Sequence, residues 1–268
     1  MNTIVLTATD LGMAALLVLA LAITTLVLNL GVTRSILIAA ARTVIQLLLV
    51  GLVLEVVFAK TSLWWVGGIF IFMLSIASWE VRARQRRGFK GTWGWGLGGL
   101  SIILSSFVVT LLTLLAIVQP TPWYDPRYAI PLLGMMMGNT MTAIALALDR
   151  IGESAWLEKG AIEAQLCLGK SSNEAMAPIK REAARIGLLP IINSMAAAGV
   201  VSLPGMMTGQ ILAGNPPGEA VKYQILIMFM IAAGTGFGVV FATHLGANRL
   251  FDERSRLRLD RLRQLKKS

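Results

Sequence analysis

Residue types on which many enzymes and metal sites depend are almost missing from this chain. It has one cysteine, Cys167, and one histidine, His244, in 268 residues. A single cysteine excludes a disulfide within the chain and any zinc or redox site built on paired cysteines. A single histidine leaves the commonest ligand of transition metals at one position only. Charged residues are scarce too, at 14% of the chain, whereas a soluble domain has about 25%.

The chain is instead rich in apolar residues arranged in long runs. Hydrophobic residues make up 56% of it, and the mean hydropathy is +0.71. Because a membrane-spanning helix needs about 20 mainly apolar residues, we predict an all-α integral membrane protein with about seven transmembrane helices. The first run should be retained as a helix and not cleaved as a signal peptide, since residues 1–10 contain no Lys or Arg. The seven runs lie near residues 11–32, 36–58, 62–79, 93–118, 129–148, 188–213 and 221–246.

The distribution of basic residues predicts how these spans are oriented. If the N-terminus lies outside, the cytoplasmic segments hold twenty Lys and Arg residues and the outer segments hold three. This asymmetry follows the positive-inside rule and predicts an N-out, C-in topology. The net charge of +10 is then explained by topology and anionic lipid, and nucleic-acid binding is not expected.

A single polytopic membrane domain over residues 1–268 is therefore expected, with two cytoplasmic parts. One is a basic tail, about residues 247–268. The other is a cytoplasmic element over about residues 149–190, read as two short helices bent at Gly169. Ser171 and Glu174 have the spacing of a capping box that opens the second helix.

The "LGKSS" sequence within this element ends like a phosphate-binding loop. The full motif needs a further glycine five residues before Gly169, where this chain has Ala164, and a strand ahead of the loop, where the pattern here is helical. The chain is thus not expected to bind ATP. Other catalytic motifs are also missing from the sequence, so an enzyme is not predicted.

Ionisable and amide side chains occur inside the second run. Arg42, Gln46 and Glu55 lie there, and the first two share a helix face because they are four residues apart. Such groups are costly in lipid, which predicts a polar side of this helix facing protein or water. The alternative for Arg42 is that its side chain extends to the cytoplasmic headgroups.

Two short segments share a pattern of glycine, methionines, glycine and an amide. They are "GMMMGNTMT" (134–142) and "GMMTGQ" (205–210). Pro204 precedes the second segment and should kink or break its helix, and broken spans are typical of substrate sites in transporters. A substrate route is favoured here, with flexible methionine packing as the alternative. The candidate route residues in these segments are Met136, Met137, Asn139, Met141, Pro204, Gly205, Met206, Met207 and Gln210.

Several stretches resemble those of a known permease family. They are "RTVIQLLLVG" (42–51), "MMGNTMTAIALALDR" (136–150), "LGKSSNEA" (168–175), "LLPIINSMAAAGVVSLPGMMTGQILAG" (188–214) and "AVKYQILIMFM" (220–230). These stretches are similar to the FetB-type permeases, described as iron-export ABC transporter permeases, and to the related plant aluminium-tolerance membrane proteins.

The resemblance implies a permease subunit that works with a separate ATP-hydrolysing subunit, which would bind ATP and Mg²⁺. It also implies a multi-pass protein of the bacterial inner membrane, a homodimer, and iron or another metal as cargo. "EAQLCLG" (163–169) is similar to the start of the docking motif of ABC importers. The residues implied in coupling to the ATPase are Glu163, Ala164, Leu168, Gly169, Ser171 and Glu174. The resemblance also adds Asn193 to the candidate route residues.

Other functions stay open at this point. A secondary transporter or channel, a nucleotide-sugar ABC permease and a membrane scaffold are the alternatives. No cluster of His, Cys and carboxylate residues with ligand spacing occurs in the sequence, so metal ligands are not assigned. Methionine-rich segments would suit a soft ion such as Cu(I) at least as well as iron.

Overall fold

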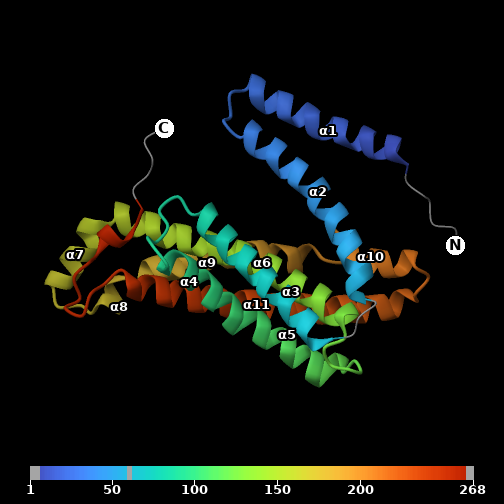
Figure 1. Cartoon of the computed structure of the whole chain (residues 1–268). Coiled ribbons are helices and arrows are strands. Elements are labelled where there is room, and N and C mark those ends of the chain that lie inside the picture. The colour runs from blue at the N-terminus through green and yellow to red at the C-terminus, as the bar shows by residue number, and fades with distance from the viewer. Residues whose placement is uncertain (1–6, 59–61, 264–268) are drawn as a thin grey trace. The chain divides into compact units, whose positions relative to one another are not determined.

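The computed structural model describes residues 7–58 and 62–263, except for the side chains of residues 55 and 56. Within these ranges the chain is almost entirely helical, and extended pairing is limited to three isolated bridges (Figure 1). The predicted all-α fold is therefore confirmed.

The helices differ greatly in length, and the fourth apolar run contains two π-helical stretches, η1 and η2. In chain order the elements are α1 (Ala8–Val27), α2 (Thr33–Phe58), α3 (Leu63–Arg84), α4 (Trp93–Ile102), η1 (Ile103–Phe107), α5 (Val108–Leu112), η2 (Thr113–Val118), α6 (Pro126–Leu157), α7 (Lys159–Cys167), α8 (Ser172–Ala175), α9 (Ala177–Ala197), α10 (Gly205–Leu212), α11 (Pro217–Arg249) and the 3₁₀ turn η3 (Leu259–Arg261).

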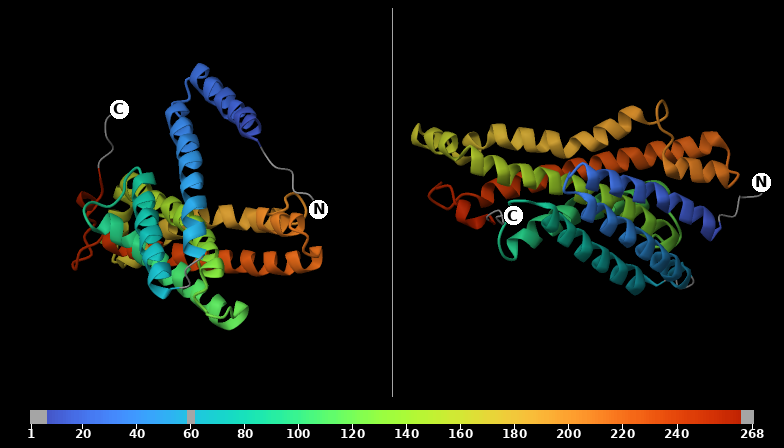
Figure 2. Two further views of the ribbon diagram at one scale, coloured as in Figure 1. Left: turned by 45° about the vertical axis from the view of Figure 1, so that its right-hand side comes forward. Right: turned by 90° about the horizontal axis from the view of Figure 1, so that it is seen from above.

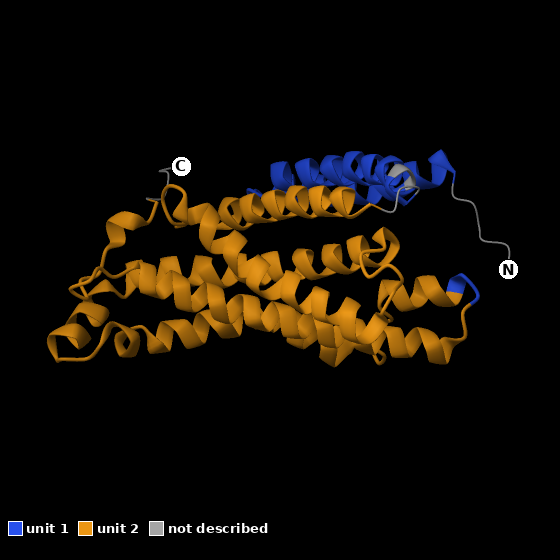
Figure 3. Cartoon of the chain, turned by 60° about the horizontal axis from the view of Figure 1, so that its bottom comes forward, with its two compact units in different colours: residues 1–61, 212–214 blue, residues 62–211, 215–268 orange. Residues whose placement is uncertain are grey.

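The chain packs as two units, one of residues 1–61 and 212–214 and the other of residues 62–211 and 215–268 (Figure 3). In the first unit, α1 and α2 form a helical hairpin. The hydroxyl oxygens of Thr25 and Thr33 lie 2.9 Å apart and hydrogen-bond across its turn. The side chains of this unit are mostly apolar, as expected of helices in lipid.

The second unit is a helical bundle centred on α6 and α11 (Figure 2). These two helices run in the same direction, since Gly234 lies against Met136, Gly238 against Thr140 and Gly246 against Leu148. Helix α9 packs on both of them, and α3, α4 and η1 complete the bundle. Glycines at successive turns let the backbones approach closely, which is the usual way in which helices associate in lipid. Close packing at small residues is thus found between α6 and α11.

Six helical stretches among the described residues are long and apolar enough to span a membrane. They correspond to six of the seven predicted runs. The remaining run, 188–213, is instead divided between the end of α9 and α10. Two features account for this. Helix α9 begins in a charged stretch, "APIKREAAR", and an irregular segment over residues 198–204, which ends at Pro204, separates α9 from α10. The predicted break before α10 is confirmed.

Segments that the topology assigns to the cytoplasm meet at one end of the second unit, which we call the basic end. It comprises residues 85–92, the α7–α8 region and the tail 250–263. The N–H of Arg86 donates to the Asp149 carboxylate at 2.6 Å, and the N–H of Lys90 donates to the Arg261 carbonyl at 2.8 Å. This grouping agrees with the predicted topology, while the side of the membrane on which it lies stays a prediction.

Candidate functional site

The methionines of the first Met–Gly segment are packing residues of the bundle core. Met136 and Met137 are 0% and 2% exposed and belong to two different hydrophobic clusters. Met141 packs at the edge of the cluster that contains Met137. Asn139 lies on the exposed face of α6, where its Nδ2 donates to the Met135 carbonyl at 2.8 Å. The segment thus divides its predicted route residues between two faces of one helix.

The break between α9 and α10 is an irregular but partly hydrogen-bonded segment. Gly199 has φ +81, a conformation that strongly favours glycine. Its N–H donates to the Ser202 carbonyl at 2.9 Å, and the Ala197 carbonyl accepts from Ser202 at 3.1 Å. Val200 is 88% exposed, and Asn193 on α9 is exposed too. Irregular backbone at membrane depth requires cover by protein or water.

Helix α10 carries the second Met–Gly segment. Met207 is buried and Met206 packs beside the cluster that contains Met136. Gln210 is half-buried, and Pro204 accepts a hydrogen bond from the Thr208 hydroxyl through its carbonyl at 3.2 Å.

The predicted route residues do not converge on one ligand-binding geometry. In the described part of the chain, no hydrogen bond joins the amides of Asn139, Asn193 and Gln210. Nor do the described residues include a group of three His, Cys, Asp or Glu side chains that could hold a metal ion. The route through these residues stays a prediction.

The structure places a set of buried hydroxyl groups inside the bundle, and the sequence reasoning missed them. Each of these side chains is at most 1% exposed. We call the set the hydroxyl seam; it consists of Ser101, Ser105, Ser106, Thr110, Thr140 and Thr235. Ser105 donates to the Ser101 carbonyl at 2.7 Å, whereas the hydroxyl oxygens of the other five have no hydrogen-bond partner among the described residues. The signal available in the sequence was the four-residue spacing of 101/105 and 106/110 within an apolar run.

The polar side predicted for α2 lies in the first unit. Arg42 and Gln46 are exposed there, and the Glu55 side chain lies outside the described residues. The burial predicted for these groups therefore stays a prediction.

The element predicted over residues 149–190 is only partly separate in the structure: residues 149–157 end α6 and residues 177–190 begin α9, so that only α7 and α8 are short helices on either side of Gly169. Gly169 has φ +84 and ends α7. The Ser171 hydroxyl and N–H donate to the Glu174 carboxylate at 2.7 and 2.8 Å, and the Glu174 N–H donates back to the hydroxyl at 3.3 Å. These hydrogen bonds lower the pKa of Glu174. The capping box is confirmed, and "LGKSS" is a turn between two helices and not a phosphate-binding loop.

This element is anchored on one side and exposed on the other. Ile162, Ala175 and Met176 are buried in the larger core cluster. Leu168 is 81% exposed, and Glu163 forms an exposed ion pair with Lys159 at 3.7 Å. The helix pair is thus attached to the core on one side and exposes the Leu168 side chain at its tip.

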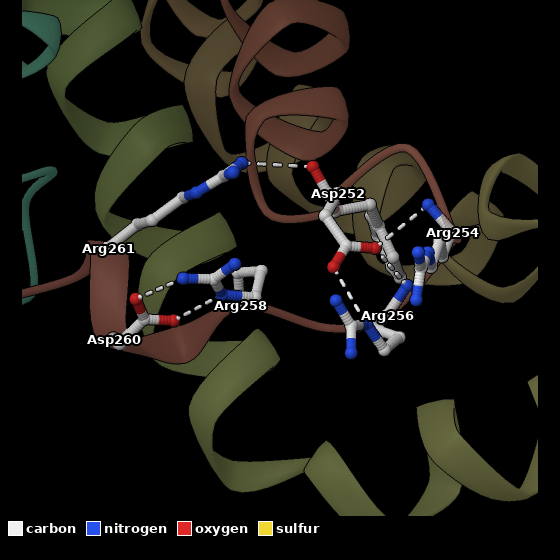
Figure 4. A network of polar contacts seen from close by, with 7 residues as sticks. Asp252, Arg254, Arg256, Arg258, Asp260 and Arg261 are labelled. Atoms are coloured by element: carbon white, nitrogen blue, oxygen red, sulfur yellow. Dashed lines mark hydrogen bonds and ion pairs between the residues drawn. The ribbon is translucent and has the colours of Figure 1, made fainter.

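Residues 250–263 of the basic tail pack as part of the basic end (Figure 4). The Arg261 guanidinium donates to the carbonyls of Arg249 and Phe251 at 2.7 and 2.9 Å. Arg258 forms two 2.9 Å hydrogen bonds with Asp260, and these lower the pKa of Asp260 to about 2. Leu262 is 1% exposed and forms a backbone bridge with Phe89.

A cavity of about 310 Å³ lies beside this tail. Its lining residues come from the 85–92 connection, the start of the cytoplasmic element and the tail: Lys90, Trp156, Lys159, Leu259, Asp260 and Leu262. The basic end therefore combines fixed backbone, exposed charge and a recess next to α7.

The long apolar helices and the charged end define a multi-pass helical membrane protein. The chain belongs to the family described as "Uncharacterised protein family (UPF0014)", which it matches over residues 8–251. It is 38% identical over 229 residues to a UPF0014 membrane protein of Synechocystis, covering 85% of this chain and 88% of the relative.

Two further relatives have more descriptive names. The chain is 31% identical to the protein ALUMINUM SENSITIVE 3 of Arabidopsis thaliana, over 81% of this chain and 77% of the relative. It is 29% identical to the probable iron export permease protein FetB of Escherichia coli, over 98% of this chain and all of the relative. The predicted relationship to these two groups is confirmed. No solved structure matches the chain significantly.

Proposed function

We propose that this protein is the permease subunit of an ABC transporter that exports iron or another metal cation from the cytoplasm of a bacterium. The observation that carries the proposal is a helix pair, α7 and α8, that is attached to the core of a membrane bundle and exposes Leu168 at its tip. The full-length similarity to a probable iron export permease supports the cargo and its direction.

The energy source in this proposal is a separate subunit that binds ATP and Mg²⁺ and docks on the cytoplasmic element. Leu168 would enter a groove of that subunit, with Glu163 and Lys159 at the rim. Because Ile162 and Met176 join the element to the core, a movement of the docked subunit would be transmitted to α6 and α9. The cavity beside Lys159 and Asp260 offers a second contact.

The proposed assembly contains two copies of the permease in the inner membrane. The irregular segment 198–204 supports this, because its exposed Val200 and Val201 surround polar backbone that lipid would not satisfy. A second copy packed there would cover the segment.

The test is co-purification with a candidate ATPase and ATP-dependent flux of Fe²⁺ in proteoliposomes. Leu168→Glu should abolish complex formation, since it places a charge in an apolar contact. Glu253→Lys, an exposed substitution at the same end but outside the element, is the control and should leave the complex intact. Transport that proceeds without any ATPase, driven by an ion gradient, would instead establish a secondary transporter.

A further inference from the structure

The hydroxyl seam is unusual because its groups are buried without partners. Ser and Thr in apolar helices commonly donate to the carbonyl four residues earlier, as Thr113 and Thr243 do here at 2.9 and 2.8 Å. The hydroxyls of Thr140 and Thr235 do not, although these side chains are 0% and 1% exposed. Thr140 lies on α6 and Thr235 on α11, and these two helices are among the most buried parts of the bundle.

Residues from three parts of the bundle meet at Gly238. A Cβ at this position would lie 2.6 Å from the Thr140 Cγ2 atom and 2.9 Å from the Ser105 Oγ atom. Because Gly238 has no side chain, α11 can pack closely against Thr140 of α6 and Ser105 of η1. Ser105 and Ser106 both lie in η1, a π-helical stretch, and such stretches occur frequently at functional sites.

Helix packing alone does not explain the seam. Small residues let helices approach closely, but Ala or Val would fill the same space without burying a polar group. A buried hydroxyl that forms no hydrogen bond destabilises the folded protein relative to an apolar side chain of similar shape. Five such groups between α4–α5, α6 and α11 are therefore expected to have polar partners, such as water or cargo, that the described residues do not supply.

We propose that the hydroxyl seam lines the route along which cargo crosses the bundle. This inference rests on the proposed transport function and adds to it the chemistry of the cargo. Hydroxyl oxygens suit a cation that keeps part of its water shell and is contacted through oxygen. Met136 and Met137, which could ligate a soft ion, are instead packed in hydrophobic clusters.

Removing hydroxyls without changing shape tests the route. The variant Thr140→Val with Thr235→Val should lower ATP-dependent Fe²⁺ flux by about tenfold, as expected for lost polar contacts, while its melting temperature stays the same or rises. Thr243→Val is the matched control, because its hydroxyl already donates to the Val239 carbonyl; it should retain flux. Unchanged flux in the double variant, or a lower melting temperature without a transport defect, would overturn the proposal.

The choice of ion tests the chemistry. Wild-type proteoliposomes should transport Fe²⁺ and Mn²⁺ faster than Cu⁺ under reducing conditions. A preference for Cu⁺ would show that sulfur and not oxygen contacts the cargo.

Access of water to the seam can be measured without transport, which separates this inference from the proposed function. In a Cys167→Ser background, Ser106→Cys should react with a small water-soluble thiol reagent at least about tenfold faster than Ala143→Cys. Both positions are buried, but Ala143 lies in an apolar cluster; the rate difference reflects the free energy of exposing each site. Equal, slow labelling of the two would mean a dry seam and would overturn the inference, even if the complex transports. Fast labelling of Ser106→Cys in a protein without ATP-driven flux would support the seam and contradict the proposed function.

Discussion

Residues 134–142 and 205–210 have nearly the same pattern of glycine, methionine and amide, yet they have different structural roles. The first segment lies in the middle of α6, a helix of 32 residues. Its Met136 and Thr140 are fully buried against glycines of α11. The second forms most of α10, a helix of 8 residues that follows a break. Its Gly205 and Gly209 have no atom within 4 Å of the position a Cβ would take.

The difference shows that the neighbouring helices, and not the pattern of glycine, methionine and amide, determine how far these residues are buried. Where α11 presents Gly234 and Gly238, the methionine and threonine of α6 fill the space left by the missing side chains. Where no helix presents a matching face, the glycines of the second segment, Gly205 and Gly209, remain at a surface, although Met207 beside them is buried. Similar segments in one chain can thus lie wholly within the core in one place and only partly within it in another.

The largest expected difference between the segments concerns their methionines. Met136→Ala removes a fully buried side chain and should lower the free energy of unfolding by about 2–5 kcal/mol. Met206→Ala, at a half-buried position, should have an effect smaller by at least about 1 kcal/mol. Denaturant titration of the purified protein in detergent measures both. Equal losses would mean that α10 is packed as tightly as α6.

The glycines of α11 that face α6 should be nearly as sensitive. Gly238→Ala would push the side chains of Thr140 and Ser105 away from α11, and overpacking of this kind lowers the free energy of unfolding by about 1–3 kcal/mol. Gly236→Ala on the same helix meets no atom within 4 Å and should be neutral or stabilising by up to about 1 kcal/mol. The melting temperatures of the pair give the comparison; a neutral Gly238→Ala would refute the close approach of α6 and α11.

The break should depend on backbone conformation more than on packing. Gly199→Ala places a side chain at φ +81 and should cost about 1–2 kcal/mol. Gly209→Ala, in α10 with open space around it, should stabilise the protein by up to about 1 kcal/mol. Thermal unfolding of both variants shows whether the irregular segment is a fixed feature. An unchanged melting temperature in Gly199→Ala would mean that the segment rearranges readily to accept the side chain.

The smallest effect is expected at Asn139. Its amide bonds to the preceding turn of its own helix at an exposed position, so Asn139→Ala should change stability by no more than about 0.5 kcal/mol. A large loss would instead indicate that Asn139 contacts another helix in the assembled protein.

The long helices and the break could be predicted because both depend on local sequence. Apolar runs define six spans, Pro204 disfavours a continuous seventh helix, and Ser171 with Glu174 cap α8 through contacts within three residues. Charges in residues 177–187 explain why the start of α9 is not part of a span. These features need no knowledge of which helices are neighbours.

The hydroxyl seam and the ordered tail could not be predicted because they depend on contacts between distant segments. Thr140 is buried only because Gly238, nearly a hundred residues later, allows α11 to approach. Leu262 is buried only because Phe89 pairs with it. A serine or methionine in an apolar run gives no indication of which face of its helix will meet a partner, so the sequence alone does not distinguish a buried hydroxyl from one that faces lipid.

The most direct test of the account compares the two candidate routes in the same proteoliposomes with the partner ATPase. One variant combines Thr140→Val and Thr235→Val, and the other combines Met206→Ala and Gln210→Ala. We expect ATP-dependent Fe²⁺ flux to fall about tenfold in the first and to stay within about twofold of wild type in the second, since only the first loses polar contacts to cargo. The opposite result, with flux lost in the second variant and kept in the first, would place the route at the broken helix and contradict the central claim.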